Sequence, residues 1–327
     1  MRMLRPVFGA LALACAAWAA LPAARAQSLC PGSTVRFLVP FPGSGSSADS
    51  LSRAVAARLA EMWGKNVIVE NKPGAGGIAS NQTIIAAAPD GCTIGLVTAA
   101  ISINPSLMKK KLPYDTLKEL TLIGQLVDIP VGLFAHPSLP VQTVQELVAY
   151  AKKQPQGLTY GTPGVGTGSH LAGALLASMT GIDLVHVPYK GAAPAELDLI
   201  AGRIALMFAA ASSEVGAVKA GKLRLIAIAG DRRFAAFPEV PTIGDSIPGY
   251  SMGSYFGVVA PGGMARPLAQ RLSQDIAKAL ASPEVKARLD TLQLAGVGSS
   301  PEEFEKLVRA DIAAMAKLVE STGLSID

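Results

Sequence analysis

Apolar positions along the chain follow two periods, one typical of strands and one typical of helices. Residues 34–39 form a short apolar run that predicts a buried strand, and residues 51–62 carry apolar side chains at helical spacing. Further strands are predicted at 66–69 and 93–97, with a helix at 78–88 between them. A strand, helix, strand, helix, strand order predicts a parallel sheet with right-handed crossovers.

The same alternation returns after an irregular stretch, so the chain is expected to build a second sheet. Strands are predicted at 120–125, 131–135, 158–160, 183–187, 204–208 and 223–229, with helices among them. A strand at 255–259 could return the chain to the first sheet, and the remainder is helical. The 327 residues, half of them hydrophobic, fit two α/β domains, predicted as 27–126 plus 253–327 and as 127–252.

The first 26 residues read as an export signal. Arg2 and Arg5 precede an apolar run over 7–21, and Ala24-Arg25-Ala26 has the small-x-small form of a cleavage site. The apolar run is shorter than a membrane-spanning helix needs. We therefore expect residues 1–26 to be a signal peptide and the mature protein to be periplasmic.

Charge and cysteine content change this picture only slightly. The formal charge of +5 includes three arginines and no acids within residues 1–26, so the rest carries +2. Without a basic stripe interleaved with aromatics, nucleic acid is not an expected partner.

Cys30 and Cys92 remain after cleavage and could form a disulfide in an oxidising compartment, although two buried thiols are equally compatible with their spacing.

Three loops share one construction, in which a strand ends, a Gly, Ser and Pro segment follows, and a helix begins. They cover residues 40–49, 161–170 and 188–194. In open α/β sheets such loops lie at the carboxyl ends of the strands, where ligands bind. If the first belongs to one domain and the others to the second, they can face each other across a cleft.

The second loop is the richest in glycine, with Gly161, Gly164, Gly166 and Gly168 close together. Glycines let successive N–H groups turn toward one point, and a helix start adds unpaired donors, so an anion is the expected guest. The alternative is a surface turn capped by Ser169. In the first loop, Asp49 is predicted to cap the following helix and is also a candidate ligand contact.

No catalytic or metal-binding motif is found. The chain has no Gly-x-Ser-x-Gly elbow, no His-Glu-x-x-His pair and no Walker lysine. His136, His170 and His186 show no metal-ligand spacing with the cysteines. His170 lies in the first turn of its helix, where it could donate to an anion or serve as a structural histidine.

One pattern supports a different function. The segment from Gly43 to Ala48 fits the loose dinucleotide template Gly-x-Gly-x-x-Gly/Ala, and Glu70 follows at the end of the second strand. The alternative prediction is therefore an exported NAD-dependent α/β oxidoreductase. Against it, Pro40-Phe41-Pro42 separates the strand from the glycines, and an exported protein meets little free NAD.

Several ordered motifs resemble those of one protein family over essentially the whole mature chain. They are Val39-Pro40-Phe41-Pro42 with Asp49 and Arg53; Val69 to Gly77, with the sequence VENKPGAGG; Ala88-Pro89-Asp90-Gly91; Gly161 to Gly173, with the sequence GTPGVGTGSHLAG; His186-Val187-Pro188-Tyr189-Lys190-Gly191 with Pro194 and Asp198; and Pro238-Glu239-Val240-Pro241-Thr242. The chain thus resembles the Bug-type periplasmic substrate-binding proteins of tripartite tricarboxylate transporters.

This resemblance implies a type II periplasmic-binding-protein fold, the "Venus flytrap", in which two α/β domains close on a small organic carboxylate. It implies no enzyme activity and no cofactor, a monomer, and a partner that is either a transporter permease or a sensor protein. Donors from the loops would hold the ligand carboxylates. Carried onto this sequence, the ligand-binding residues are Phe41, Gly45, Ser46, Ser47, Asp49, Thr162, Gly166, Thr167, Ser169, His170, Tyr189, Gly191 and Ala192.

Two departures from the family pattern bear on specificity. The loop over residues 43–48 is one residue longer and richer in hydroxyls than the usual Pro-Phe-Pro-Pro-Gly-Gly-x-x-Asp form. Ala209 stands after Met207-Phe208, where relatives commonly carry Asp. If that acid contacts a ligand amine or a water in relatives, this protein is expected to prefer a carboxylate without an amino group.

Overall fold

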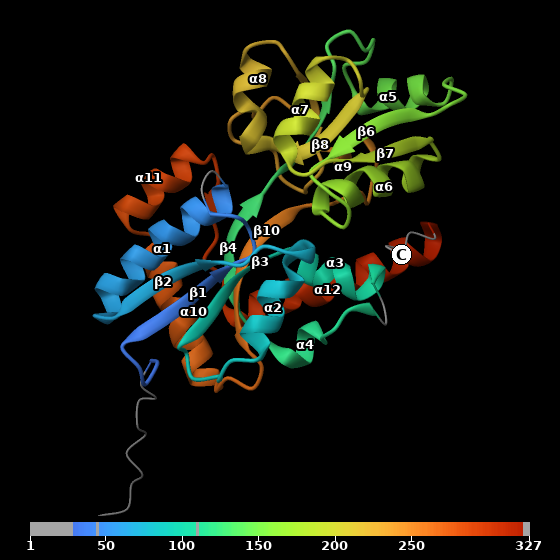
Figure 1. Cartoon of the computed structure of the whole chain (residues 1–327). Helices are drawn as coiled ribbons and strands as arrows, with labels where there is room; N and C mark the ends of the chain where they lie inside the picture. The colour runs from blue at the N-terminus through green and yellow to red at the C-terminus, as the bar shows by residue number, and fades with distance from the viewer. Residues whose placement is uncertain (1–28, 44–45, 109–110, 323–327) are drawn as a thin grey trace, which may run out of the picture.

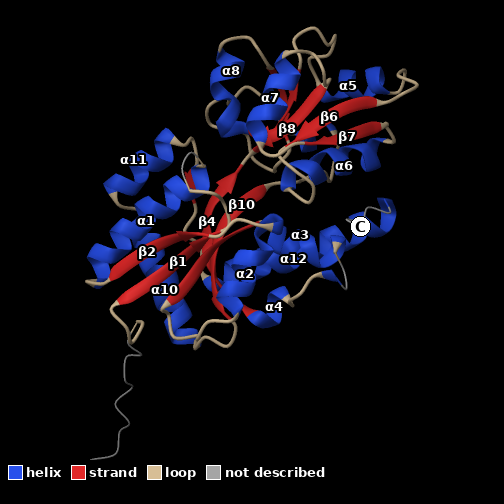
Figure 2. Ribbon diagram, in the orientation of Figure 1, coloured by secondary structure: helices blue, strands red, loops and turns tan. Residues whose placement is uncertain are grey.

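The computed structural model describes residues 29–43, 46–108 and 111–322. The predicted signal peptide at 1–26 and the predicted ligand contact Gly45 lie outside these residues. The described chain forms two sheets, each flanked by helices, and so confirms the two-domain α/β class (Figures 1 and 2).

The first sheet has six strands in the order β11-β4-β10-β3-β1-β2. Its strands are β1 (Thr34–Val39), β2 (Asn66–Asn71), β3 (Thr93–Thr98), β4 (Leu120–Ile129), β10 (Ser254–Pro261) and β11 (Ala295–Gly296). Its helices are α1 (Ser47–Trp63), the 3-10 turn η1 (Ala75–Gly77), α2 (Ile78–Ile85), α3 (Ala100–Leu107), α4 (Thr116–Glu119), α10 (Arg266–Leu280), α11 (Pro283–Thr291) and α12 (Pro301–Thr322).

The second sheet has five strands in the order β7-β6-β8-β5-β9. Its strands are β5 (Val131–Ala135), β6 (Leu158–Thr162), β7 (Leu184–Pro188), β8 (Leu206–Ala210) and β9 (Arg224–Ile228). Its helical segments are α5 (Val144–Ala151), α6 (Gly168–Thr180), α7 (Ala192–Ile200), η3 (Ala211–Glu214), α8 (Val215–Lys219) and α9 (Ile243–Ser246). We call the parts built on these two sheets the first and second lobe.

The chain passes between the lobes twice, next to the pairing of β4 with β10. It leaves the first sheet at Ile129 and enters the second at Val131, and it returns after β9 to begin β10 at Ser254, which pairs with Ile129. β4 therefore stays in the first sheet three residues beyond the predicted boundary at 126. The domain limits 27–126 plus 253–327 and 127–252 remain a prediction.

The register of the strands turns both sets of carboxyl ends toward this junction. β4 runs parallel to β1 and β3, because both β3 and β4 pair antiparallel with β10, so Ile129 lies at the carboxyl edge of the first sheet. In the second sheet, Val131 opposes Ala210 at the end of β8, and β8 runs parallel to β6 and, through β6, to β7. The loops that follow β1, β6, β7 and β8 thus all open toward the junction.

Apolar side chains pack on both faces of each sheet. The first lobe buries one cluster under α1, α10 and α11. A second cluster lies under α2, α3 and α12 and continues without a break to α5 and α6 of the second lobe. Gly257 of β10 lets α12 pack closely against the sheet, because a Cβ at this position would lie 2.2 Å from the ring of Phe304. A third cluster fills the space under α7 and α8.

A disulfide joins Cys30, just before β1, to Cys92, just before β3, with their Cα atoms 4.6 Å apart. Since β1 and β3 are neighbours in the sheet, the bond ties the amino ends of two central strands. The predicted pairing, rather than two free thiols, is the arrangement present.

Replacing both cysteines by serine is expected to lower the free energy of unfolding by about 4 kcal/mol, because the bond closes a loop of 62 residues in the unfolded chain. Urea denaturation of the double variant measures this. Wild-type protein unfolded with excess reductant is the control and should match it. An unchanged midpoint in the double variant would contradict the expectation.

Candidate functional site

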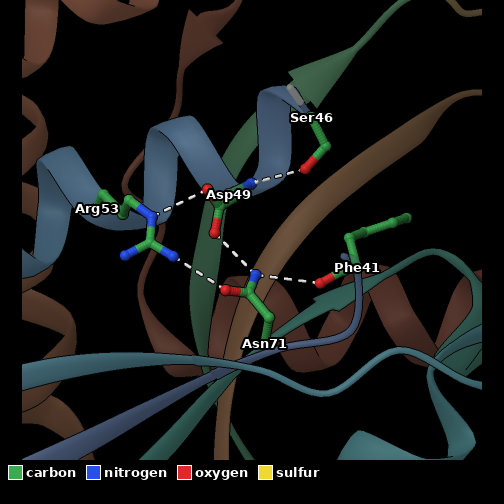
Figure 3. A network of polar contacts seen from close by, with 5 residues as sticks. All are labelled: Phe41, Ser46, Asp49, Arg53 and Asn71. Atoms are coloured by element: carbon green, nitrogen blue, oxygen red, sulfur yellow. Dashed lines mark hydrogen bonds and ion pairs between the residues drawn. The ribbon is translucent and has the colours of Figure 1, made fainter. Parts of the chain in front are cut away.

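The first loop ends in a capped helix start, shown in Figure 3. The Ser46 side chain accepts a hydrogen bond from the Asp49 N–H at 3.1 Å and has the extended backbone of an N-cap. The prediction that Asp49 caps this helix is therefore wrong. Ser46 fits the cap because its hydroxyl lies three residues before the bonded N–H, while Asp49 is already inside the first turn.

Asp49 instead anchors the loop to its surroundings. One carboxylate oxygen accepts from Arg53 Nε at 2.9 Å, and the other accepts from Asn71 Nδ2 at 2.7 Å. Asn71 Nδ2 also donates to the Phe41 carbonyl, and Asn71 Oδ1 accepts from Arg53. Asp49 is only 4% exposed. Its carboxylate thus ties the first turn of α1 to Asn71, which in turn holds the Phe41 carbonyl, and has both oxygens engaged within the protein.

The second loop also ends in a capped helix start. Thr167, with extended backbone, accepts the His170 N–H at 3.2 Å and donates to the Gly164 carbonyl at 2.9 Å. Ser169 is therefore not the cap, contrary to the alternative considered from the sequence. Within the described part of the chain, the Ser169 hydroxyl has no hydrogen-bond partner, although the residue is only 7% exposed.

Within this loop, two side chains hold glycine backbone in place. Gly166 donates its N–H to His170 Nδ1 at 3.2 Å and has a φ of 75°, a left-handed conformation that favours glycine. The Thr162 hydroxyl donates to the Gly164 carbonyl at 3.2 Å, and Thr162 is fully buried. The loop is therefore a fixed structure in which part of the donor set is already used.

Two histidines stack beneath this loop. The rings of His170 and His186 lie 4.0 Å apart at an angle of 19°, and Tyr160 lies against His186 at 5.0 Å. Burial and then the neighbouring His170 lower the pKa of His186 to about 4, and burial lowers the pKa of His170. Both rings are therefore neutral at pH 7.

The third loop uses its polar groups internally. Tyr189 donates its N–H to the Thr162 carbonyl at 3.0 Å and its hydroxyl to Asp198 at 2.8 Å. Burial, followed by the bond to Asp198, raises the pKa of Tyr189 to about 12. Gly191 donates its N–H to the Pro163 carbonyl at 3.0 Å. This loop is thereby fastened to the second one, and Ala192 begins α7 beside it.

After these bonds, the donors left over lie at helix starts. The first N–H groups of a helix have no partner inside it. Within the described residues, the N–H groups of Ser47 and Ala48 at the start of α1 have no acceptor, nor do those of Gly168 and Ser169 at the start of α6. Each lobe thus presents unpaired N–H groups at the junction.

The electrostatics of the site come from these donors rather than from basic side chains. Arg53, beside the first loop, is engaged by Asp49 and Asn71. Lys190 is the basic residue of the third loop and is exposed. A helix start stabilises a nearby anion by roughly 0.3–1 kcal/mol and by up to ~2 kcal/mol where it is partly buried. The arrangement can hold an anion without a full positive charge.

The two lobes meet at the second loop. A Cβ on Gly168 would lie 3.3 Å from the Gly253 carbonyl oxygen, so the start of α6 touches the segment that leads into β10. Ala211 donates to the Pro130 carbonyl at 2.8 Å, which places the end of β8 beside the other crossing. The sequence singled out Ala209 at this end of β8 for its bearing on specificity but did not list it among the contact residues; the strand order makes β6 and β8 a topological switch point.

Glu214 is a buried acid that sequence reasoning also missed. It closes η3, just after β8, is 1% exposed, and its Oε2 atom has no hydrogen-bond partner among the described residues. Burial, followed by the nearby Glu196 carboxylate, raises the pKa of Glu214 to about 7. No sequence signal marked it, because its surroundings come from α7.

The described residues contain no cluster of three or more potential metal ligands. They also contain no helix of the length and apolarity that a membrane span requires. For the dinucleotide alternative, Glu70 would have to be free to meet a ribose, but it forms a paired contact with Arg36, with two N···O distances of 2.8 Å. That ion pair lowers the pKa of Glu70.

Comparison with solved structures identifies the fold as that of two-domain periplasmic solute-binding proteins. A Rhodopseudomonas palustris protein, Rpa4515 with adipate, superposes with a TM-score of 0.78 at 31% identity, covering 90% of this chain and 99% of the other. The periplasmic binding protein BugD gives 0.76 at 31%, covering 90% and 99%. MatC (Rpa3494) from the same bacterium with bound malate gives 0.74 at 29%, covering 89% and 100%.

The family model described as "Tripartite tricarboxylate transporter family receptor" matches residues 51–324. The chain belongs to this family, which confirms the Bug-type resemblance and the two-domain binding-protein fold. Family and structural neighbours are binding receptors, so the oxidoreductase alternative has no support.

Glu214 gives a prediction about pH and stability. Its pKa is raised on folding, so the folded state holds the proton more tightly, and stability is lost as pH rises from the unfolded value of about 4.5 through about 7. Glu214→Gln is expected to stabilise the protein at pH 8 by roughly 2–3 kcal/mol and to have little effect at pH 4.5. Urea denaturation at both pH values measures this; an equal effect at both would contradict it. Glu239→Gln, on an exposed glutamate, is the control.

Proposed function

We propose that this protein is a periplasmic solute-binding protein that captures a small organic carboxylate between its two lobes. The observation that carries the proposal is the pair of helix starts that face the junction, with free N–H groups at Ser47 and Ala48 on one side and at Gly168 and Ser169 on the other. A ligand bridging both sets favours the closed arrangement, because only there does it meet donors from both lobes.

In this proposal the predicted contact residues divide into two roles. The N–H groups named above and the hydroxyls of Ser47 and Ser169 meet the ligand carboxylate. Phe41, packed edge-to-face on Phe256 with ring centroids 6.3 Å apart, supports the first loop. Ala192 begins α7 beside these groups, and the remaining described candidates hold them in position through internal bonds: Ser46, Asp49, Thr162, Gly166, Thr167, His170, Tyr189 and Gly191.

The ligand is proposed to be a carboxylic acid without an amino group. Solved relatives carry adipate in one case and malate in another. Asp49 has its oxygens engaged by Arg53 and Asn71, and Ala209 offers no side-chain acceptor, so neither residue favours an ammonium group. The protein is further proposed to be exported through residues 1–26, to act as a monomer without catalysis or cofactor, and to deliver its ligand to a permease or a sensor protein.

A thermal-shift panel of adipate, malate, benzoate and glutamate tests this function. At about 100 times its dissociation constant, a bound acid stabilises the folded protein by roughly 2.7 kcal/mol. Adipate or malate is expected to raise the melting temperature, and glutamate is expected to have less effect. An absence of any shift across the panel and its homologous acids would refute the carboxylate proposal.

Two neighbouring substitutions separate ligand contact from helix capping. Ser169→Ala is expected to weaken acid binding about tenfold while leaving the empty protein as stable as wild type, because its hydroxyl has no hydrogen-bond partner among the residues that the structure describes. Thr167→Ala is the matched control and should cost the empty protein about 1 kcal/mol through loss of the cap. Unchanged affinity in Ser169→Ala, measured by calorimetry, would remove Ser169 from the site.

A further inference from the structure

Beneath the glycine loop of the second lobe, two neutral histidines connect the strands to the helix start. His186 lies on β7, opposite Tyr160 in the register, and contacts Thr162 at the end of β6. We propose that His186 is a positioning residue of the anion site: it donates to Thr162 and stacks on His170, and so fixes the two side chains that hold the loop. The inference rests on the proposed function for its effect on binding.

The hydrogen bonds around Thr162 assign the proton of His186. A threonine hydroxyl has one proton and two lone pairs. The Thr162 proton goes to the Gly164 carbonyl at 3.2 Å, and one lone pair faces the Gly164 N–H at 3.4 Å. The other lone pair faces His186 Nε2 at 2.7 Å. His186 therefore carries its proton on Nε2 and donates it, which completes the bonding of the hydroxyl.

The same reasoning fixes His170. Its Nδ1 accepts the Gly166 N–H, so this nitrogen carries no proton and the ring is held as the Nε2–H tautomer. A proton on Nδ1 would face the Gly166 N–H, and two donors cannot form a hydrogen bond, so the bond that holds Gly166 would be lost. The ring orientation needed for this bond is the one that lies parallel to His186, because the stacked rings leave His170 little freedom to turn.

The surroundings of the pair keep both rings in this state. The Tyr160 ring lies 5.0 Å from that of His186, and its hydroxyl donates to the His170 carbonyl at 3.3 Å. Among the described contacts of the two rings there is no charged side chain. His186 is the partly exposed member of this group and lies on the edge strand β7, so replacing it leaves no sealed cavity.

Two substitutions at His186 separate its hydrogen bond from its ring. His186→Phe keeps a flat ring against His170 but loses the donor to Thr162. His186→Gln places an amide N–H near the position of Nε2 and restores the donor. His136→Phe is the matched control, since His136 belongs to the same lobe and, among the described residues, its ring forms hydrogen bonds only with Ser138. All variants are compared for adipate binding by calorimetry and for melting of the empty protein.

The proposal expects a specific ranking. His186→Phe should weaken adipate binding about tenfold, while His186→Gln and His136→Phe should stay within about threefold of wild type. Equal losses of affinity in the Phe and Gln variants, in step with equal drops in melting temperature, would reduce His186 to a packing residue and overturn the proposal. Wild-type affinity in both would overturn it as well.

A measurement on the empty protein keeps the inference independent of the ligand. Amide hydrogen exchange, followed by NMR, should show Gly166 protected in wild type and in His186→Gln and about tenfold faster in His186→Phe. The ring-nitrogen shifts of His170 should report the Nε2–H tautomer in wild type. If wild type binds no acid, the proposed function fails, yet these two readouts still decide the role of His186. An unchanged Gly166 exchange rate in His186→Phe would overturn that role.

Discussion

The antiparallel pairing of β4 with β10 is the constraint on which the site depends. Because Ile129 and Ser254 sit opposite each other, both crossings leave the first sheet at the same place. The second sheet must then begin beside them, and its antiparallel β5 turns the ends of β6 and β8 back toward the first sheet. Had the crossings used the opposite edge, the glycine loop and the Ser46 loop would point apart, and neither helix start could share a ligand.

Much of this arrangement could be predicted from the sequence, because a strand followed by glycine, serine and a helix has few other structures available. Which residue forms the N-cap of each helix could not be predicted. Ser46 and Asp49 both satisfy the composition rule for a cap, and so do Thr167 and Ser169. The Asp49 carboxylate does not cap the helix because it is engaged by Arg53 and by Asn71, which lies on the next strand. His186 and Glu214 were missed since the groups that matter to them, Thr162 and Glu196, lie on a neighbouring strand and helix, which spacing along the chain does not reveal.

The use of neutral donors has a physical advantage for a protein that must also release what it binds. A buried arginine would bind a carboxylate strongly, and its own charge would be left unpaired when the lobes open and the ligand leaves. Backbone N–H groups at Gly168 and Ser169 can return to water at little cost. The two histidines beside the glycine loop are kept uncharged, His170 by burial and His186 by burial and by the neighbouring His170.

The helix α12 has a consequence for the direction in which the molecule can move. Its side chains Met315, Leu318 and Val319 belong to the apolar cluster that also holds Leu171 and Leu176 of α6, so the two lobes share one dry face on this side. Separation of the lobes at this side would expose apolar surface to water, which costs free energy in proportion to the area exposed. The lobes are therefore expected to hinge at the side of α12, and a spectroscopic label that reports opening belongs on the side of the molecule away from α12.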